Sequence, residues 1–217
     1  MMTPGTTSTT QTDIGPSQSQ FYESKSFGGA PHTYSVGDDV NLYPGFLNDR
    51  FKSVMVGPAA KVLAWQHANS TGNYAVLTGN NPDITSIGGL SRFKVLANDT
   101  RVIAFKFKDA TGGEARRYSL KVNAADVGEQ LLYSNADDEF KLVGTMPVSG
   151  PPVTTAIYVR DEQSGVYIAT GSVYFQWNAE TQQVDIVSQE QFPAQLKHER
   201  EDASRFIITL TSAQLPH

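Results

Sequence analysis

The chain has 217 residues, which is enough for one large or two small domains. Hydrophobic residues make up 39% and charged residues 18%, a balance typical of a globular chain rather than a disordered one. The formal net charge of −5 argues against a nucleic-acid partner, and the absence of cysteine excludes disulfides, thiolate metal sites and cysteine nucleophiles.

The N-terminal segment, residues 1–19, consists mainly of Thr, Ser, Gln, Gly and Pro. Such a segment buries too little apolar surface to offset its ordering entropy, so we predict a disordered tail. The segment lacks the basic-then-apolar pattern of a signal peptide, and the chain has no run of 18 apolar residues. These features predict a cytoplasmic protein without a membrane partner.

A pattern occurs twice within residues 20–97, once over 22–56 and again over 65–95. Each copy opens on an aromatic residue, Tyr22 or Trp65, and has a glycine seven positions later. The copies also end alike, on Phe51-Lys52-Ser53-Val54-Met55-Val56 and on Leu90-Ser91-Arg92-Phe93-Lys94-Val95. A unit of about 40 residues cannot easily bury its apolar face alone, so the pair predicts one shared core.

Residues 101–217 show a different organisation, with short alternating stretches separated by turn residues. Seven or eight such strands predict a β-sandwich of the immunoglobulin-like type, with Trp177 as a core aromatic and a short helix or long loop over 188–204. Only a few residues, 97–100, separate the two halves, so we expect the two domains to dock against each other. The predicted strands are 102–107, 118–122, 140–143, 156–159, 166–169, 173–177, 184–187 and 206–210.

The first copy of the repeat carries a recognisable motif. Tyr22-x-x-x-x-Phe27-x-Gly29, followed by Tyr34-Ser35, resembles the signature hairpin of the βγ-crystallin Greek-key motif. In such a hairpin the two aromatic rings pack together, and the glycine permits a backbone conformation that a Cβ would forbid. A serine at position 35 would hydrogen-bond back across the hairpin.

The second copy is degenerate, because it keeps Trp65 and Gly72 but has Ser70 at the phenylalanine position. The resemblance implies an all-β protein. Together with the strand pattern of the second half, it leads us to expect a βγ-crystallin double Greek-key domain over 20–97, followed by an immunoglobulin-like β-sandwich over 101–217.

The resemblance also implies calcium. Microbial βγ-crystallins bind this ion through two loops, each with two Asn/Asp residues, two variable residues, Ser/Thr and Ser. The loops cross, so that each site takes a hydroxyl from the other copy. Here the first loop reads Asn48-Asp49-Arg50-Phe51-Lys52-Ser53, and the second reads Ile87-Gly88-Gly89-Leu90-Ser91-Arg92.

The defects of the two loops are complementary. Asn48, Asp49 and Ser91, with the carbonyl of Glu23, are predicted to form one calcium site. The other site would join Gln66, Ile87 and Gly88 to Lys52, whose ammonium group stands where a ligand oxygen belongs and disables it. One or two carboxylates give a weak site, with a dissociation constant on the order of 10–1000 μM. The alternative for Asn48-Asp49 is an ordinary turn.

No catalytic motif stands out in the sequence. The four histidines have no close metal-ligand spacing, and a phosphate-binding loop and a nucleophile elbow are both absent. We therefore expect a non-enzymatic protein of structural, stress or developmental storage type. The alternative is a binding module whose second domain recognises a protein or glycan through exposed aromatic residues. Those residues would be Tyr158, Tyr167, Tyr174 and Trp177.

Overall fold

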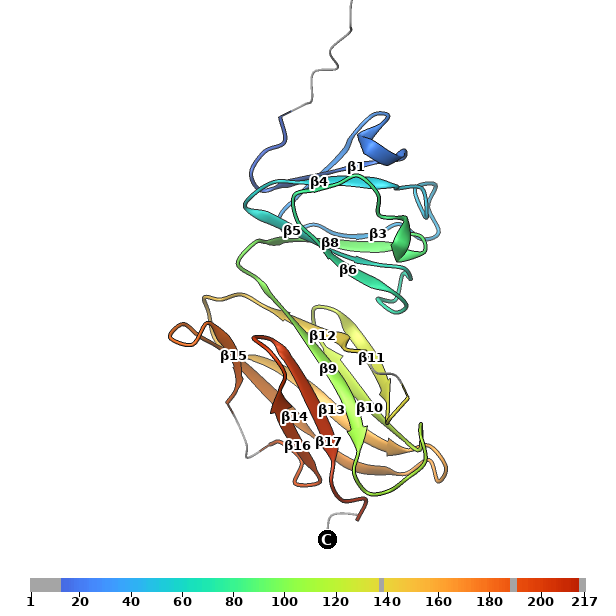
Figure 1. The fold of residues 1–217 in the computed structure, drawn as a ribbon, viewed down its shortest axis with the longest axis vertical. Coiled ribbons are helices and arrows are strands. Elements are labelled where there is room, and N and C mark those ends of the chain that lie inside the picture. Colours follow the sequence, from blue (N-terminus) through green and yellow to red (C-terminus); the bar gives the residue numbers. More distant parts are fainter. Residues whose placement is uncertain (1–12, 137–138, 188–190, 215–217) are drawn as a thin grey trace, which may run out of the picture. The chain divides into compact units, whose positions relative to one another are not determined.

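The computed structural model describes residues 13–136, 139–187 and 191–214. The described chain divides into two units (Figure 1). The first unit contains the residues up to Trp65 together with Ala75–Asn98, and the second contains Gln66–Tyr74 together with the residues from Asp99 on. The opening of the second repeat, after Trp65, therefore groups with the C-terminal half.

The first unit is built from short strands and two turns of 3₁₀ helix, η1 and η2. The elements of the first copy are β1 (Gln18–Tyr22), η1 (Lys25–Phe27), β2 (His32–Ser35), β3 (Asp39–Asn41) and β4 (Ser53–Val56). Those of the second copy are β5 (Ala60–Trp65), β6 (Tyr74–Leu77), β7 (Asn80–Asn81), η2 (Thr85–Ile87) and β8 (Arg92–Ala97).

The two copies exchange strands. One sheet has the order β2-β1-β4-β7, and the other has the order β3-β8-β5-β6. Strand β7 of the second copy pairs with β4, while β3 of the first copy pairs with β8. Each sheet is therefore completed by a strand from the other copy, which gives a double Greek key and confirms the predicted fold of this domain.

A single core fills the space between these sheets. Phe21, Phe51 and Val54 of the first copy pack in one cluster with Leu90 and Phe93 of the second. The ring centroids of Phe21 and Phe93 are 4.4 Å apart. Neither copy could bury these side chains alone, so the shared core predicted from the repeat is confirmed.

The signature hairpin folds as its motif implies, with one difference. The rings of Tyr22 and Phe27 lie edge to face at 5.8 Å, and Gly29 has a φ of +94°. The serine that pins the hairpin is Ser53, whose hydroxyl donates to the Ser24 carbonyl at 2.7 Å and accepts from the Phe27 N–H at 3.0 Å. The prediction for Ser35 is wrong, because Ser35 lies in β2 opposite Gln18.

The start of the described chain also departs from prediction. Residues 1–12 of the predicted tail lie outside the described residues. From Gln18 the chain is already in β1, and Ser19 is fully buried opposite Val56. The main chain of Pro16 accepts from the Ala59 N–H at 2.8 Å, so the domain begins earlier than position 20.

The second unit is a sandwich of two sheets, in which β9 and β17 lie side by side (Figure 1). The sheets have the orders β12-β9-β17-β16 and β11-β10-β13-β14-β15. Their facing side chains form one core around Phe105, Phe175 and Phe206. The strands are β9 (Arg101–Asp109), β10 (Tyr118–Ala124), β11 (Gly128–Tyr133), β12 (Lys141–Met146), β13 (Val153–Asp161), β14 (Tyr167–Asn178), β15 (Gln183–Ile186), β16 (Leu196–Arg200) and β17 (Arg205–Leu210).

The sandwich confirms the expected class of fold, and its strands differ from the predicted ones in three places. Strand β11 was not predicted. Strands expected at 166–169 and 173–177 form one long β14 that continues through Gly171. The stretch 188–204, expected to hold a short helix or a long loop, contains β16, and its residues 188–190 lie outside the described residues. Trp177 packs against the core while remaining partly exposed, and the Arg101 guanidinium lies 4.5 Å from its ring centroid.

Candidate metal site

The two loops that were predicted to cross do lie against each other. The first loop connects β3 to β4, and the second leads from β7 through η2 into β8. The Asp49 N–H donates to the Leu90 carbonyl at 3.0 Å, and the Leu42 N–H donates to the Ser91 carbonyl at 2.8 Å. Two consecutive residues of the second loop therefore hold both ends of the segment that carries Asn48 and Asp49.

Asp49 packs directly onto the second loop at Gly89. Gly89 has a φ of +108°, and a Cβ atom at this position would lie 2.4 Å from Asp49 Oδ1. Asp49 itself has a positive φ of 60°. The glycine therefore makes room for the carboxylate, and this contact could not be found from the Asn/Asp loop pattern.

The side-chain oxygen of Asn48 is the feature that most favours a bound cation. Its Nδ2 donates to Asp49 Oδ2 at 2.7 Å, which orients the amide. Its Oδ1 is buried and accepts no hydrogen bond from the residues that the structure describes. A buried acceptor without a partner costs free energy, and amide and carboxylate oxygens are the ligands that calcium prefers. The side chains present therefore fit a hard divalent cation.

Glu23 lies beside the same loop, just after β1. The Lys52 N–H donates to the Tyr22 carbonyl at 2.8 Å and so joins the first loop to this point of the chain. The Glu23 carboxylate forms an ion pair with Arg50 at 2.6 Å and lies 3.5 Å from His32 Nε2. The carboxylate of Glu23 is thus engaged by Arg50, and the role of its carbonyl as a ligand stays a prediction.

Ser91 is buried at the same crossing. Its N–H donates to the Trp65 carbonyl at 3.1 Å, and its own carbonyl accepts from Leu42. The structure thus brings the main chains of Asn48, Asp49 and Ser91 to one crossing. The described residues contain no group of three or more His, Asp or Glu side chains suited to a metal, so any ion here would depend on amide, hydroxyl and carbonyl oxygens beside the single carboxylate of Asp49.

Lys52 binds within its own loop. Its Nζ donates to the Asp49 carbonyl at 2.7 Å, rather than to a carboxylate. In the second loop, at the positions equivalent to Asn48 and Asp49, Ile87 is buried and Gly88 ends η2 in the left-handed conformation. Neither residue has a side-chain oxygen, and the disabling of the second site by Lys52 stays a prediction.

A charged cluster near the second loop was missed from the sequence. The Asp83 carboxylate forms an ion pair with Lys25 at 2.6 Å and accepts from the Thr85 N–H and hydroxyl. These bonds hold the pKa of Asp83 well below its usual range, with the Lys25 bond as the largest cause. The cluster links the two copies and fixes the start of η2.

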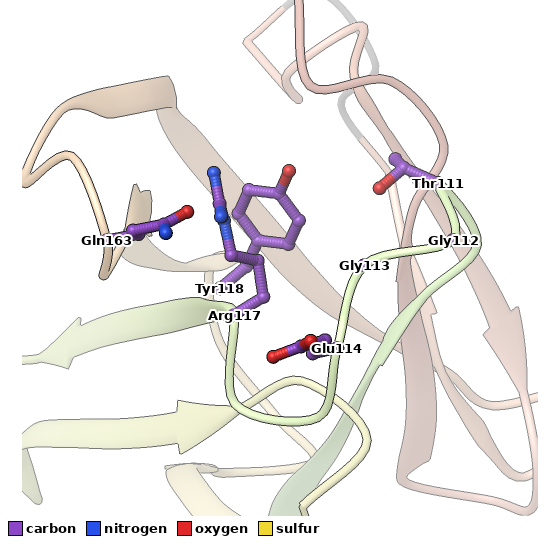
Figure 2. Close-up of a pocket in the computed structure, with 7 residues that line it drawn as sticks. All are labelled: Thr111, Gly112, Gly113, Glu114, Arg117, Tyr118 and Gln163. Atoms are coloured by element: carbon purple, nitrogen blue, oxygen red, sulfur yellow. The ribbon is translucent and has the colours of Figure 1, made fainter.

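The second unit has a pocket of about 380 Å³ at the β9–β10 loop. Figure 2 shows Arg117 and Tyr118 side by side, between Gln163 and the glycine loop that carries Thr111. Asp161 binds Arg117 at 2.7 Å. Burial alone would raise the pKa of Asp161, but the Gln163 N–H and Arg117 outweigh it and lower this pKa. The guanidinium is therefore already occupied by a carboxylate.

The aromatic residues named for the binding-module alternative do not form one exposed patch. Tyr158 and Tyr167 lie edge to face at 6.2 Å. The Tyr174 hydroxyl donates to Gln191 at 2.7 Å, and Trp177 packs against the core. A contact surface there would therefore rest on Tyr158 and Tyr167.

None of the helical segments within 13–136, 139–187 and 191–214 has the length and hydrophobicity needed to cross a lipid bilayer.

Comparison with family models assigns a family to each half. Residues 15–97 match the model described as Beta/Gamma crystallin, and residues 103–211 match the model described as Membrane binding. The expectation that the chain has no membrane partner is therefore not confirmed.

Individual relatives extend over nearly the whole chain. The crystal structure of Abundant Perithecial Protein from Neurospora crassa is 56% identical, covers 94% of this chain and 99% of its own, and superposes with a TM-score of 0.86. A βγ-crystallin domain of that protein, solved in the Ca²⁺-bound form, is 52% identical over 41% of this chain and 98% of its own, with a TM-score of 0.40.

Another relative matches over a similar length of the chain at lower identity. Calcium-dependent cell adhesion molecule 1 of Dictyostelium discoideum is 27% identical over 206 residues, which is 89% of this chain and 95% of that protein. The family models and the 56% identical Neurospora crassa structure show that the chain belongs to the βγ-crystallin superfamily, with a second domain of the family described as Membrane binding.

Proposed function

We propose that the chain is a non-enzymatic calcium-binding protein with one weak site where the two loops cross. The observation that carries this proposal is the buried Asn48 Oδ1, which lacks a hydrogen-bond donor beside the Asp49 carboxylate. A calcium ion held by Asn48, Asp49, Ser91 and the Glu23 carbonyl would satisfy that oxygen. When bound, the ion would supply positive charge between the two copies, while the residues themselves orient the oxygens.

Binding to the folded state alone makes calcium a stabiliser. At a free concentration one hundred times the dissociation constant, it adds about 2.7 kcal/mol to the free energy of unfolding. With a constant on the order of 10–1000 μM, this effect requires calcium well above resting cytosolic levels. The proposal therefore describes a persistent structural protein that calcium reinforces.

Calorimetric calcium titration of the full chain tests the site. We expect one binding event in the wild type and its loss, or at least a tenfold weakening, in Asn48→Ala. Asn80→Ala, a change at an exposed position in β7, is the matched control and should titrate like the wild type. A flat wild-type titration at millimolar calcium, or equal binding by Asn48→Ala, would contradict the proposal.

A second candidate function is attachment to a surface through the second domain. It is favoured by the Membrane binding family model over 103–211 and by the relative named as a calcium-dependent cell adhesion molecule. Tyr158 and Tyr167 on the outer side of the five-stranded sheet, with Lys121 opposite Tyr158, are the residues we assign to this contact. Loss of vesicle or cell-surface binding in Tyr167→Ser, with normal calcium uptake, would support it.

A further inference from the structure

The loop that carries the candidate calcium ligands also exposes two aromatic side chains. Tyr43 is 62% exposed and Phe46 is 75% exposed, the highest values among the large hydrophobic residues that the structure describes. They lie on either side of Pro44-Gly45, in the segment Leu42–Asp49, which we call the aromatic tip. Aromatic residues are rarely left this open without a contact to make, so the tip requires an explanation.

The aromatic tip is held rigidly at its base. Leu42 is buried and Leu47 packs against the core, while Tyr43 and Phe46 remain outside. The Gly45 N–H donates to the Leu42 carbonyl at 2.6 Å, and the Asn48 N–H donates to the Gly45 carbonyl at 3.2 Å. These turns present the two rings without help from a neighbouring element, so their exposure is a feature of the fold.

The tip is connected to the candidate calcium site by direct contacts. The Arg50 guanidinium lies 4.1 Å from the centroid of the Phe46 ring, and the same group forms the ion pair with Glu23 at 2.6 Å. Asn48 and Asp49 end the tip, and Ser91 and Leu90 hold its two ends. Any ion bound by these residues therefore lies at the base of the two exposed rings.

Charge decides what kind of partner the tip fits. The charged groups around the crossing, Glu23, Asp49, Arg50 and Lys52, balance each other. A bound calcium ion adds two positive charges to this neutral region, in a chain whose overall charge is −5. Without calcium at its base, the tip therefore offers no net attraction to a negative surface, whereas with calcium bound there it does.

We propose that the aromatic tip is a calcium-gated contact for an anionic phospholipid surface, with Tyr43 and Phe46 entering the interfacial layer. This inference rests on the proposed calcium site. Tyrosine and phenylalanine rings suit the bilayer interface, and one weak apolar anchor needs a second, electrostatic one for stable attachment. Two rings bury only about 150–250 Å² each, well short of the roughly 1,200 Å² of a stable protein interface.

The experiment is sedimentation of the full chain with phosphatidylserine–phosphatidylcholine vesicles, in calcium and in chelator, alongside a calcium titration without vesicles. We expect calcium-dependent binding in the wild type, and about tenfold weaker partition in Phe46→Ser and in Tyr43→Ser. Val76→Ser is the matched control, because Val76 is an exposed apolar residue of β6 in the same unit, at 43%. It should bind vesicles like the wild type, and all three variants should retain calcium uptake.

Each other outcome has a distinct meaning. Calcium uptake without vesicle binding, or equal vesicle binding in chelator, overturns the gated contact and leaves the calcium site standing. A wild type that takes up no calcium overturns the proposed function and the gating with it. Calcium-dependent self-association without vesicles, abolished by Phe46→Ser, would replace the lipid surface by a second copy of the chain.

Discussion

At the scale of single residues, Ser53 shows how a small polar side chain can hold a motif together. Its hydroxyl bridges the Ser24 carbonyl and the Phe27 N–H inside a fully buried position. The second copy has Arg92 at the equivalent place, where its guanidinium binds Asp39 at 2.8 Å and lies 5.5 Å from the Trp65 ring centroid. The two hairpins are therefore secured by different chemistry.

Removal of the Ser53 hydroxyl should be costly. Ser53→Ala removes two hydrogen bonds, to the Ser24 carbonyl and the Phe27 N–H, from a partly buried hairpin, so we expect a loss of about 1–3 kcal/mol in the free energy of unfolding. Urea denaturation of the full chain measures it. Ser35→Ala, at an exposed position of β2, should change stability by no more than about 0.5 kcal/mol. A larger effect at Ser35 than at Ser53 would contradict this assignment.

His198 makes the second unit sensitive to mild acid. Burial, followed by the nearby Arg200 charge, lowers the pKa of His198 below its ordinary value of 6.5. Below pH 6.5 the unfolded chain therefore takes up a proton more readily than the folded one, and the stability contributed by neutral His198 declines as the pH falls through the folded pKa. Thermal melts across this range should show the decline reduced in His198→Gln and retained in His67→Gln, a change at an exposed histidine.

At the scale of loops and strands, the crossing depends on a glycine that no motif marks. Gly89→Ala would push a Cβ into Asp49 Oδ1 and force a side chain into a backbone with φ of +108°. We expect about 1–3 kcal/mol of destabilisation and weaker calcium uptake. Gly79→Ala, with φ of +60° and open space around its Cβ, should cost about 1 kcal/mol and leave calcium uptake intact. Calorimetry and calcium titration of both variants distinguish the two glycines, and equal calcium affinities would count against the Asp49 assignment.

Strand exchange predicts that neither copy folds alone. Without the second copy, β4 loses β7 and β3 loses β8, and Phe21 and Phe51 lose half of their core. A peptide of residues 13–58 should therefore show no cooperative melt by circular dichroism. A cooperative transition in that peptide would mean that the shared core is not required.

The sequence predicted elements best where burial alternates. Strand β17, and β10 from Leu120 on, alternate buried side chains with more exposed ones, which is the pattern that a half-buried strand requires. Strand β16 was missed because only Leu196 is buried among Lys, His, Glu and Arg. The break expected near Gly171 is absent because β14 pairs with β13 along its length, with the main chain of Gln191 beside Gly171.

At the scale of the whole molecule, the repeat predicted the shared core but not which strands of each copy belong to which sheet. The paired endings at Phe51 and Leu90 correctly indicated two equivalent loops. The exchange of β3 and β7 between the two sheets depends on pairing between residues far apart in the sequence, and no local pattern around either strand specifies it. The loops that carry Asn48, Asp49 and Ser91 meet at one crossing because the repeat relates them, whereas the Asp49–Gly89 contact depends on backbone geometry.

The two units should also respond differently to calcium. Differential scanning calorimetry of the full chain should show a calcium-dependent rise in the transition of the first unit, equivalent to about 2.7 kcal/mol at one hundred times the dissociation constant. Asn48→Ala should abolish this rise. A rise that survives in Asn48→Ala would place the ion elsewhere.

Strands β9 and β17 run parallel at the centre of one sheet, paired from Arg205 and Ala104 to Leu210 and Asp109. Strand β9 is the first strand of the sandwich, and β17 is the last one in the part of the chain that the structure describes. Force applied between the start of β9 and the end of β17 acts along both strands. The hydrogen bonds between the two strands would therefore bear this force together and break together rather than one after another. We therefore expect this sheet to resist extension between Arg101 and Leu210.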